Sequence, residues 1–451
     1  MKEQVLTGGK PWKCLVQFAI PLLLGNLFQQ FYSMADSFII SRFLGLHAFT
    51  GVSSTASLSN MIIGFANGMT IGLAIPLAQR FGAGDEDGVR RHYLVNAGIS
   101  LGVSVLLTIP ALCLTRNLLL LMHTPEDIFS YAREYLQVIF AGIAASVFYN
   151  FYANTLRALG DSRSPLHYLL ISSAVNILLD LLFVRVIPLG VRGAALATVI
   201  SQLVAVALCF RQVGRSSRIL QADSLRSLRW EGEDVSAPGR LALSNLWVGL
   251  PMGFQASLIS LGVVLIQGSI NTMGTASIAA YAAAHRIDGI AVEPLRSLGT
   301  AMSTFTAQNY GAKQYRRIRQ GLKECILVSL LLSAFLSLLM IFGGRWLSGL
   351  FIGAEEDGIL GMSHQWLMIH GFLYGILALL FDFRYTLQGL GNTGIVLQAS
   401  MMELAARVFS AFLLIPSLGF LGSCIETPLS WLAALLPCLI VWRNTAGKLF
   451  L

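Results

Sequence analysis

Long apolar segments recur along this chain, and they decide what it can fold into. Stretches of 20 or more mostly apolar residues alternate with short clusters of glycine, proline or charged residues. A run of this length crosses the hydrocarbon core of a bilayer as a helix, since a helix satisfies its own backbone polar groups there. Only 12% of the 451 residues are charged, against about 25% in a soluble globular chain. The sequence therefore predicts an all-α polytopic membrane protein.

We expect twelve transmembrane helices from these segments. The first lacks the small-residue cleavage site of a removable signal peptide and is too long for one. Lysine and arginine gather in every second connecting loop, which predicts that both termini are cytoplasmic. The expected location is the inner (plasma) membrane of a cell, as a multi-pass protein. The predicted spans lie near residues 14–40, 50–79, 93–115, 131–156, 166–187, 192–213, 241–271, 276–308, 322–343, 361–387, 395–415 and 420–442.

Composition excludes several classes of function. The net charge of +8 follows the loop pattern of a membrane protein, so it does not indicate nucleic-acid binding. The six cysteines show no metal or disulfide spacing. No HExxH, GxSxG or GxxxxGK[ST] motif occurs, so we expect neither an enzyme nor a cofactor, and ATP cannot drive transport directly. An ion gradient is left as the energy source.

The chain also repeats itself. TLRALGD at 155–161 corresponds to TLQGLGN at 386–392, and LGVRGA at 189–194 corresponds to LGFLGS at 418–423. Pro21 corresponds to Pro251 in the first helix of each half, and we expect both to bend their helices. The repeat predicts two pseudo-symmetric six-helix bundles, 1–213 and 241–451, joined by a cytoplasmic linker at 214–240. Transport proteins are commonly built this way, with the substrate site between the halves.

Two acids lie inside predicted spans without a basic residue near them. They are Asp36 and Asp180. A charge at bilayer depth costs roughly 2.5–3.5 kcal/mol on insertion scales, so such residues usually have a function. Binding and release of a proton or a small cation is the simplest one. The alternative is a polar cluster that only holds helices together.

Several segments together resemble the multidrug and toxic compound extrusion (MATE) transporters. They are AIPLLLGNLFQQFYSMADSFIISRFLG in the first span, GLPMGFQASLISLG in the seventh, TLRALGDSRSP followed by SSAVNILLDLLF, and MSTFTAQNYGAKQYRRIRQG after the eighth. The resemblance covers nearly the whole chain. It implies a secondary active exporter that exchanges a small organic, often cationic, substrate for H+ or Na+ by alternating access. Flippases for lipid-linked precursors share the architecture and remain the alternative.

The resemblance also implies an ion-coupling site in the amino-terminal bundle. In one branch of the family the site's pattern matches Asp36, Asn176, Asp180 and Thr198 of this sequence, with Ala194 where a backbone carbonyl ligand is expected. Asn176 and Asp180 are four residues apart, so they lie on one helix face. The oxygens of the set suit a protonated carboxyl network or Na+, with Asp36 and Asp180 as the charged ligands.

The carboxyl-terminal half lacks both acids at the repeat-equivalent positions. Its predicted spans hold balanced charges instead, including the helix-spaced pairs Glu293–Arg296 and Glu403–Arg407. Such pairs are more often structural or gating features than ion carriers, although a substrate role stays open.

Five polar residues within spans are candidates for the substrate cleft, although each could instead form an interhelical hydrogen bond. We expect the substrate and the lipid bilayer as partners, and a monomer. The five candidates are Gln29, Tyr32, Asn154, Gln255 and Asp382.

Overall fold

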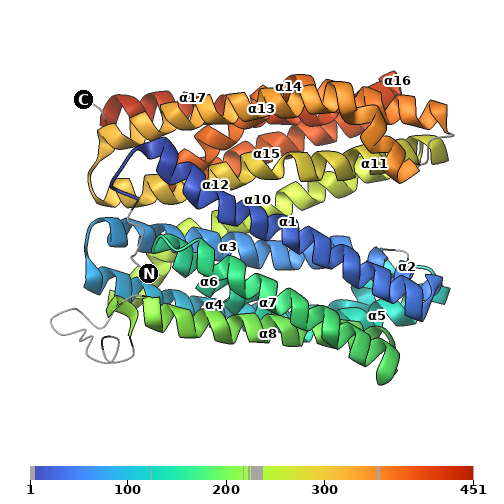
Figure 1. The fold of residues 1–451 in the computed structure, drawn as a ribbon, viewed down its shortest axis with the longest axis horizontal. Coiled ribbons are helices and arrows are strands. Elements are labelled where there is room, and N and C mark those ends of the chain that lie inside the picture. The colour runs from blue at the N-terminus through green and yellow to red at the C-terminus, as the bar shows by residue number, and fades with distance from the viewer. Residues whose placement is uncertain are drawn as a thin grey trace. The chain divides into compact units, whose positions relative to one another are not determined.

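The protein is helical throughout the part that its structure, a computed structural model, describes. That part comprises residues 6–122, 124–216, 218–221, 224, 237–352 and 356–449. Every regular element within these ranges is a helix (Figure 1). The all-α fold class is thereby confirmed.

The chain divides into two compact units, and two long helices contribute to both. Unit 1 holds Leu24–Ser257, and unit 2 holds Leu6–Leu23 with Leu258–Leu451. The divisions therefore fall inside α1 (Pro11–Leu44) and α10 (Ala237–Asn271), a short way after Pro21 and Pro251 respectively. The expected bundle limits 1–213 and 241–451 stay a prediction, and most of the expected linker 214–240 lies outside the described residues.

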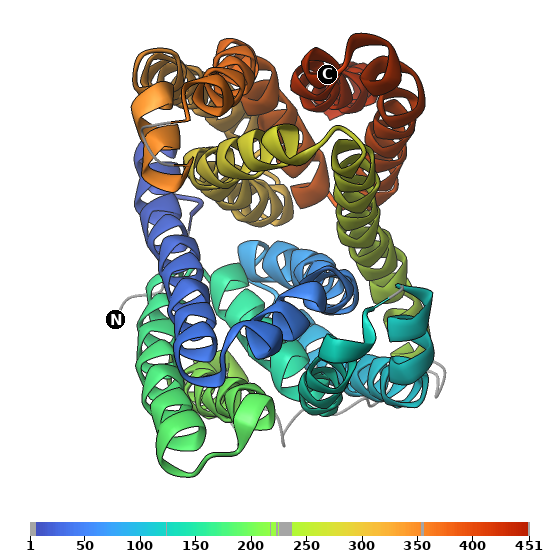
Figure 2. The same ribbon diagram turned by 90° about the vertical axis from the view of Figure 1, so that its right-hand side faces the viewer.

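Unit 1 is a bundle of helices packed along one another, seen lengthwise in Figure 1 and nearly end-on in Figure 2. Neighbouring pairs include α3 with α4 and α6, and α8 with α5, α6 and α7. Besides the parts of α1 and α10, its elements are α2 (Leu46–Ser54), α3 (Ala56–Gly82), α4 (Glu86–Leu121), α5 (Glu126–Ala141), α6 (Ile143–Ala158), α7 (Arg163–Asp180), the π-helix η1 (Leu181–Val186), α8 (Gly190–Ser216) and the short η2 (Arg218–Leu220).

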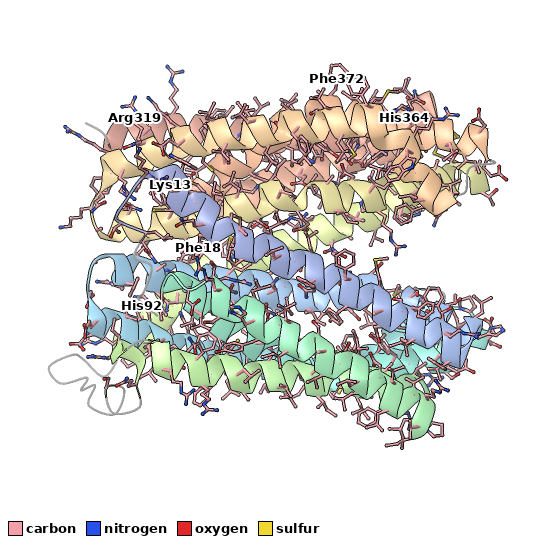
Figure 3. The ribbon with its side chains drawn as sticks, viewed as in Figure 1. Lys13, Phe18, His92, Arg319, His364 and Phe372 are labelled. Atoms are coloured by element: carbon pink, nitrogen blue, oxygen red, sulfur yellow. The ribbon has the colours of Figure 1, made fainter. Side chains whose placement is uncertain are left out.

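Unit 2 packs in the same way around α14, which contacts α11, α12, α13, α15 and α17. Large apolar side chains cover its outside: Phe372 is 78% exposed and projects away from the bundle in Figure 3, as a lipid-facing residue should. Its elements are α11 (Thr275–Ala291), α12 (Glu293–Gly311), α13 (Tyr315–Ile352), α14 (Asp357–Gly389), α15 (Thr393–Phe409), the π-helix η3 (Ser410–Leu414), α16 (Ile415–Leu418) and α17 (Phe420–Leu449).

Backbone hydrogen bonds explain why the start of α1 belongs to unit 2. The Leu6 amide donates to Gln308 Oε1 at 2.9 Å, and the Trp12 amide donates to Glu324 Oε2 at 2.8 Å. The Arg317 guanidinium donates to the Gly9 carbonyl at 2.7 Å. Charged and amide side chains thus fix this segment to α12 and α13.

Ten helices of the described chain are long and apolar enough to cross a membrane. The count rises to eleven if α5 and α6, which meet at an angle of 47°, form one broken span. The expected span 276–308 is divided into α11 and α12, of 17 and 19 residues, and neither is among them. Twelve spans are therefore not confirmed.

The backbone itself is duplicated. Gly45, Gly160 and Gly190 have φ of 84°, 89° and 62°, and Gly274, Gly391 and Gly419, 229 to 231 residues later, have 88°, 84° and 60°. Lys313, with φ of 57°, takes the left-handed conformation of Gly84, its repeat partner. The two π-helices, η1 and η3, also occupy equivalent places. The same turns were therefore kept in both halves.

Candidate functional site

Asp36 and Asp180 meet inside unit 1. Asp36 lies on α1, and Asp180 is the last residue of α7, where the α-helix changes to the π-helix η1. The two carboxyl groups are close enough to form a hydrogen bond with each other once one of them carries a proton. Neither Asp180 oxygen, nor Asp36 Oδ1, has a hydrogen-bond partner among the described residues, although all three atoms are buried. The pairing expected from the sequence is present in the structure.

Asn176 adds its amide to this cluster. Its side chain is fully buried one turn before Asp180, and neither its oxygen nor its nitrogen is hydrogen-bonded within the described chain. A buried polar group without a partner costs about 1–3 kcal/mol. Five such atoms on Asp36, Asn176 and Asp180 make a site that a proton or a cation would stabilise.

Ala194 and Thr198 lie on α8, which packs against the same region. Ala194 belongs to an apolar cluster with Ile40 of α1 and Val184 of η1, so α1, η1 and α8 converge here. The Thr198 hydroxyl donates to the Ala194 carbonyl at 3.2 Å. The lone pairs of that hydroxyl are still available, which fits the oxygen ligand that the sequence predicts.

Two tyrosines border the carboxyl pair. Tyr32, one turn before Asp36, and Tyr135 on α5 both lie close enough to interact electrostatically with Asp36 and Asp180. Tyr32 was expected at the substrate cleft. Tyr135 is not among the residues predicted from the sequence, although a hydroxyl-bearing aromatic residue inside an apolar span is a recognisable signal.

The donors present suit a proton or a hard monovalent cation. No group of three histidine, cysteine, aspartate or glutamate side chains in the described part of the chain could hold a metal ion. The cluster offers carboxylate, amide, hydroxyl and carbonyl oxygens, the ligand type that hard cations prefer. Na+ therefore fits the residues, as H+ does.

Unit 2 keeps the backbone of this site without its chemistry. The place of Asp36 is taken by Leu265 or the buried Ile266, and η3 follows Phe409 where η1 follows Asp180. An apolar helix end and a π-helix remain there, but no acid.

The buried charges of unit 2 form an ion triad. Glu403 of α15 accepts hydrogen bonds from Arg384 of α14 at 2.9 Å and from Arg407 at 3.2 Å, and all three side chains are buried. The expected pair Glu403–Arg407 is thus an ion pair, and Arg384 joins it. Glu293 and Arg296 also pair, at 2.8 Å. Their structural or gating role stays a prediction.

Four of the expected cleft residues belong to unit 1, and Asp382 belongs to unit 2. Gln29 is exposed on α1, whereas Gln255 Oε1 is buried on α10. Asn154 joins helices, since it donates to Thr70 Oγ1 of α3 at 3.1 Å. Asp382 is buried between α13 and α14, where it accepts hydrogen bonds from Ser329 and Cys325.

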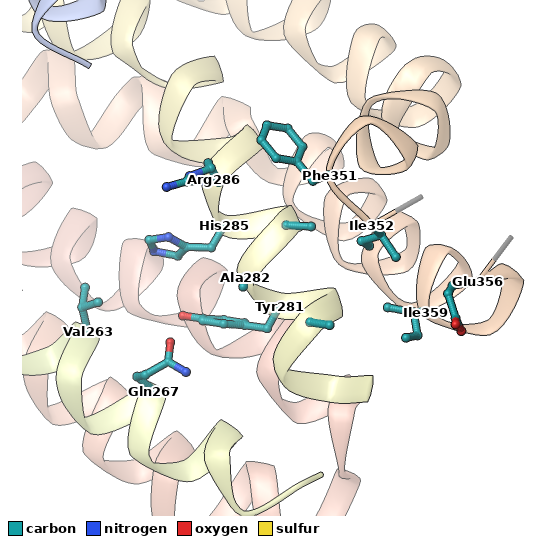
Figure 4. A pocket seen from close by; sticks show the side chains of 12 residues that line it. Val263, Gln267, Tyr281, Ala282, His285, Arg286, Phe351, Ile352, Glu356 and Ile359 are labelled. Carbon is teal, nitrogen blue, oxygen red and sulfur yellow. The ribbon is translucent and has the colours of Figure 1, made fainter. Parts of the chain in front are cut away.

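A pocket of about 770 Å3 opens in unit 2, between α10, α11, the end of α13 and the beginning of α14. Gln267, Tyr281 and His285 face one part of it, and Arg286 and Phe351 another (Figure 4). None of the five expected cleft residues lines it. Tyr281 and His285 are four residues apart on α11, so their shared helix face could have been recognised from the sequence.

Comparisons with known proteins identify the family. The MatE family model matches residues 21–182 and 251–413, so it matches the two halves separately. Two relatives from Bacillus subtilis (strain 168) are each 28% identical: probable multidrug resistance protein YoeA, over 79% of this chain and 77% of its own length, and probable multidrug resistance protein YpnP, over 90% and 87%. A solved structure, the outward-facing conformation of a multidrug resistance MATE family transporter of the MOP superfamily, superimposes with a TM-score of 0.88. Its sequence is 23% identical, and the superposition covers 100% of this chain and 99% of that one.

Fold, apolar helices and internal repeat define a multi-pass helical protein of the cell membrane. This chain belongs to the MatE family.

Proposed function

We propose that this protein exports small organic molecules, including cationic drugs, in exchange for H+ or Na+. One observation carries the proposal: the cluster of Asp36, Asn176 and Asp180, in which five buried polar atoms lack partners in the described chain. The family and the multidrug resistance relatives support the export of drugs. They do not favour a flippase for lipid-linked precursors.

The ion would bind between Asp36 and Asp180. As a proton, it would occupy the hydrogen bond between the two carboxyl groups, so that only one negative charge remains buried. As Na+, it would be held by both carboxylates together with the Asn176 and Thr198 side-chain oxygens and the Ala194 carbonyl. In both cases the ion lowers the cost of keeping two acids away from water.

Substrate and ion would exclude one another, either by charge or by bending of α1. Pro21 has no amide hydrogen and therefore removes one helical hydrogen bond, which makes a bend nearby less costly. By linkage, the substrate must weaken ion binding as much as the ion weakens substrate binding. The cycle by alternating access, both termini in the cytoplasm and the monomeric state belong to this proposal.

Transport by reconstituted protein tests the proposal. Proteoliposomes with an imposed pH or Na+ gradient would be loaded with a fluorescent cation such as ethidium, and export by wild type, Asp36→Asn and Asp180→Asn compared. Each variant should lose gradient-driven transport at least about tenfold, since an amide cannot carry the charge. Asp127→Asn is the matched control, because Asp127 is an exposed acid on α5. Wild-type rates in both site variants under either gradient would refute the coupling assignment.

A further inference from the structure

Arg157 is a cation of unit 1 that the ion-coupling site does not use. Arg157 lies in the last turn of α6 and is half-buried. One of its terminal nitrogens donates to Asn154 Oδ1 at 3.0 Å. Its Nε is buried and has no partner in the described part of the chain. The guanidinium therefore has donors left over after its contacts within the protein.

No carboxylate neutralises Arg157. Across the described ranges, no acid lies within ion-pair distance of it. The nearest acid in sequence, Asp161, is engaged at the start of α7, where it accepts from the Arg163 amide at 3.1 Å and from the Ser164 amide at 2.9 Å and hydroxyl at 2.6 Å. A charge that is partly removed from water and has no counter-ion is costly. An anion bound there would remove this cost.

The other half of the chain shows that the fold does not need this charge. TLRALGD at 155–161 aligns with TLQGLGN at 386–392, which places Gln388 at the position of Arg157. Gln388 is buried in the last turn of α14, before the same left-handed glycine turn that follows α6. A neutral amide thus supports identical local backbone, so the arginine has another use.

Arg157 belongs to the same unit as the carboxyl pair. Tyr149, two turns earlier on α6, interacts electrostatically with both Arg157 and Tyr32. Tyr32 in turn lies beside Asp36 and Asp180. Eight residues of α-helix span about 12 Å, so Arg157 is about that far along α6 from Tyr149. Two tyrosines, Tyr149 and Tyr32, are thus within electrostatic range of the arginine and of the acids respectively, all within unit 1.

We propose that Arg157 binds an anionic group, a carboxylate or phosphate, of the transported molecule. The planar fork of a guanidinium matches both groups by paired hydrogen bonds. The protein would then accept zwitterionic or anionic compounds as well as cations. This inference depends on the proposed function, because it assigns part of the substrate site to unit 1.

A pair of dyes that differ in one carboxyl group provides the test. Rhodamine 110 carries a free carboxylate, and rhodamine 123 is its methyl ester. Binding of each dye to purified protein in phosphatidylcholine nanodiscs would be followed by fluorescence anisotropy. Arg157→Gln should weaken rhodamine 110 binding about tenfold or more and change rhodamine 123 binding less than about twofold, because only the former loses a charge-assisted hydrogen bond. Arg157→Lys, which keeps the charge but not the fork, should lie between wild type and Arg157→Gln.

Controls separate this role from others. Arg163→Gln removes an exposed arginine close by in the sequence and should change the binding of neither dye. If Arg157→Gln weakens the binding of both dyes equally, the role of Arg157 is structural and the proposal is overturned. Unchanged binding of both dyes by this variant would also overturn it, as would a wild type that binds neither dye. A further measurement replaces phosphatidylcholine with the anionic lipid phosphatidylglycerol in the nanodiscs. If this lipid weakens rhodamine 110 binding to wild type but not to Arg157→Gln, a lipid headgroup is the anion and the proposal is overturned. Binding requires no gradient, so failure of ion coupling in the Asp36 and Asp180 variants would be seen independently.

Discussion

Removal of Glu403 should destabilise unit 2 more than removal of any exposed acid. Glu403 accepts two hydrogen bonds from charged donors, at 2.9 Å from Arg384 and 3.2 Å from Arg407, and the Nε atoms of both arginines already lack partners in the described chain. A hydrogen bond to a charged group contributes about 1.5–3 kcal/mol. The two bonds together give about 3–6 kcal/mol, in line with the roughly 3–5 kcal/mol for breaking a buried ion pair.

The melting temperature of Glu403→Ala should therefore fall by about 6–24 °C, at about 2–4 °C per kcal/mol for a unit of this size. A thiol-reactive fluorophore can report unfolding, since Cys209, Cys325, Cys424 and Cys438 are all buried. Glu293→Ala is the matched control. Glu293 is also buried, but its partner Arg296 keeps 49% of its side chain exposed and can be hydrated once the acid is removed, so the effect should be smaller than that of Glu403→Ala.

A triple variant tests the cause. If the loss comes from two uncompensated arginines, then Arg384→Met and Arg407→Met combined with Glu403→Leu should recover most of the stability, because an apolar triad leaves no buried charge. The reasoning is refuted if Glu403→Ala melts within about 2 °C of the Glu293→Ala control. A triple variant that melts as low as Glu403→Ala would show that shape, and not charge, holds these helices together.

Two further predictions concern the backbone. Gly68→Ala should destabilise the protein by about 1–3 kcal/mol, since its methyl group would lie 2.3 Å from the Met252 carbonyl oxygen. Gly64→Ala, with open space at that position, should be neutral or stabilising. Equal melting temperatures for the two variants would contradict this reasoning. Lys313→Gly should raise stability by about 1 kcal/mol, because lysine at a φ of 57° is strained and glycine is not, and a lower melting temperature than wild type would count against it.

The sequence predicted the carboxyl pair because unpaired acids stand out in an apolar span. Asp36 and Asp180 needed no knowledge of their distance to be singled out, and the helix spacing of Asn176 added the third member. The ion triad was only half predicted. Glu403 and Arg407 are one helical turn apart, which is a visible spacing. Arg384 lies on another helix, and a pair between two helices leaves no local pattern in the sequence.

Hydropathy also could not show where helices break. The interruption between α5 and α6 lies at Gly142, where a methyl group would come within 2.3 Å of Val199 on α8. The need for glycine at this position is set by tertiary packing against α8, which hydropathy does not report. The break between α11 and α12 had a local signal that was not used: Pro294 follows Glu293 at the start of α12, and the residue before a proline disfavours helix.

The duplication separates what the fold requires from what chemistry requires. Both halves keep the same left-handed glycines and a π-helix at the same place. π-helices often mark functional sites, yet η3 has no acid before it, so the π-helix here belongs to the fold. Function must then reside in the side chains that differ between equivalent positions. Asp180 against Phe409 and Arg157 against Gln388 are two such differences, and both place the charge in unit 1.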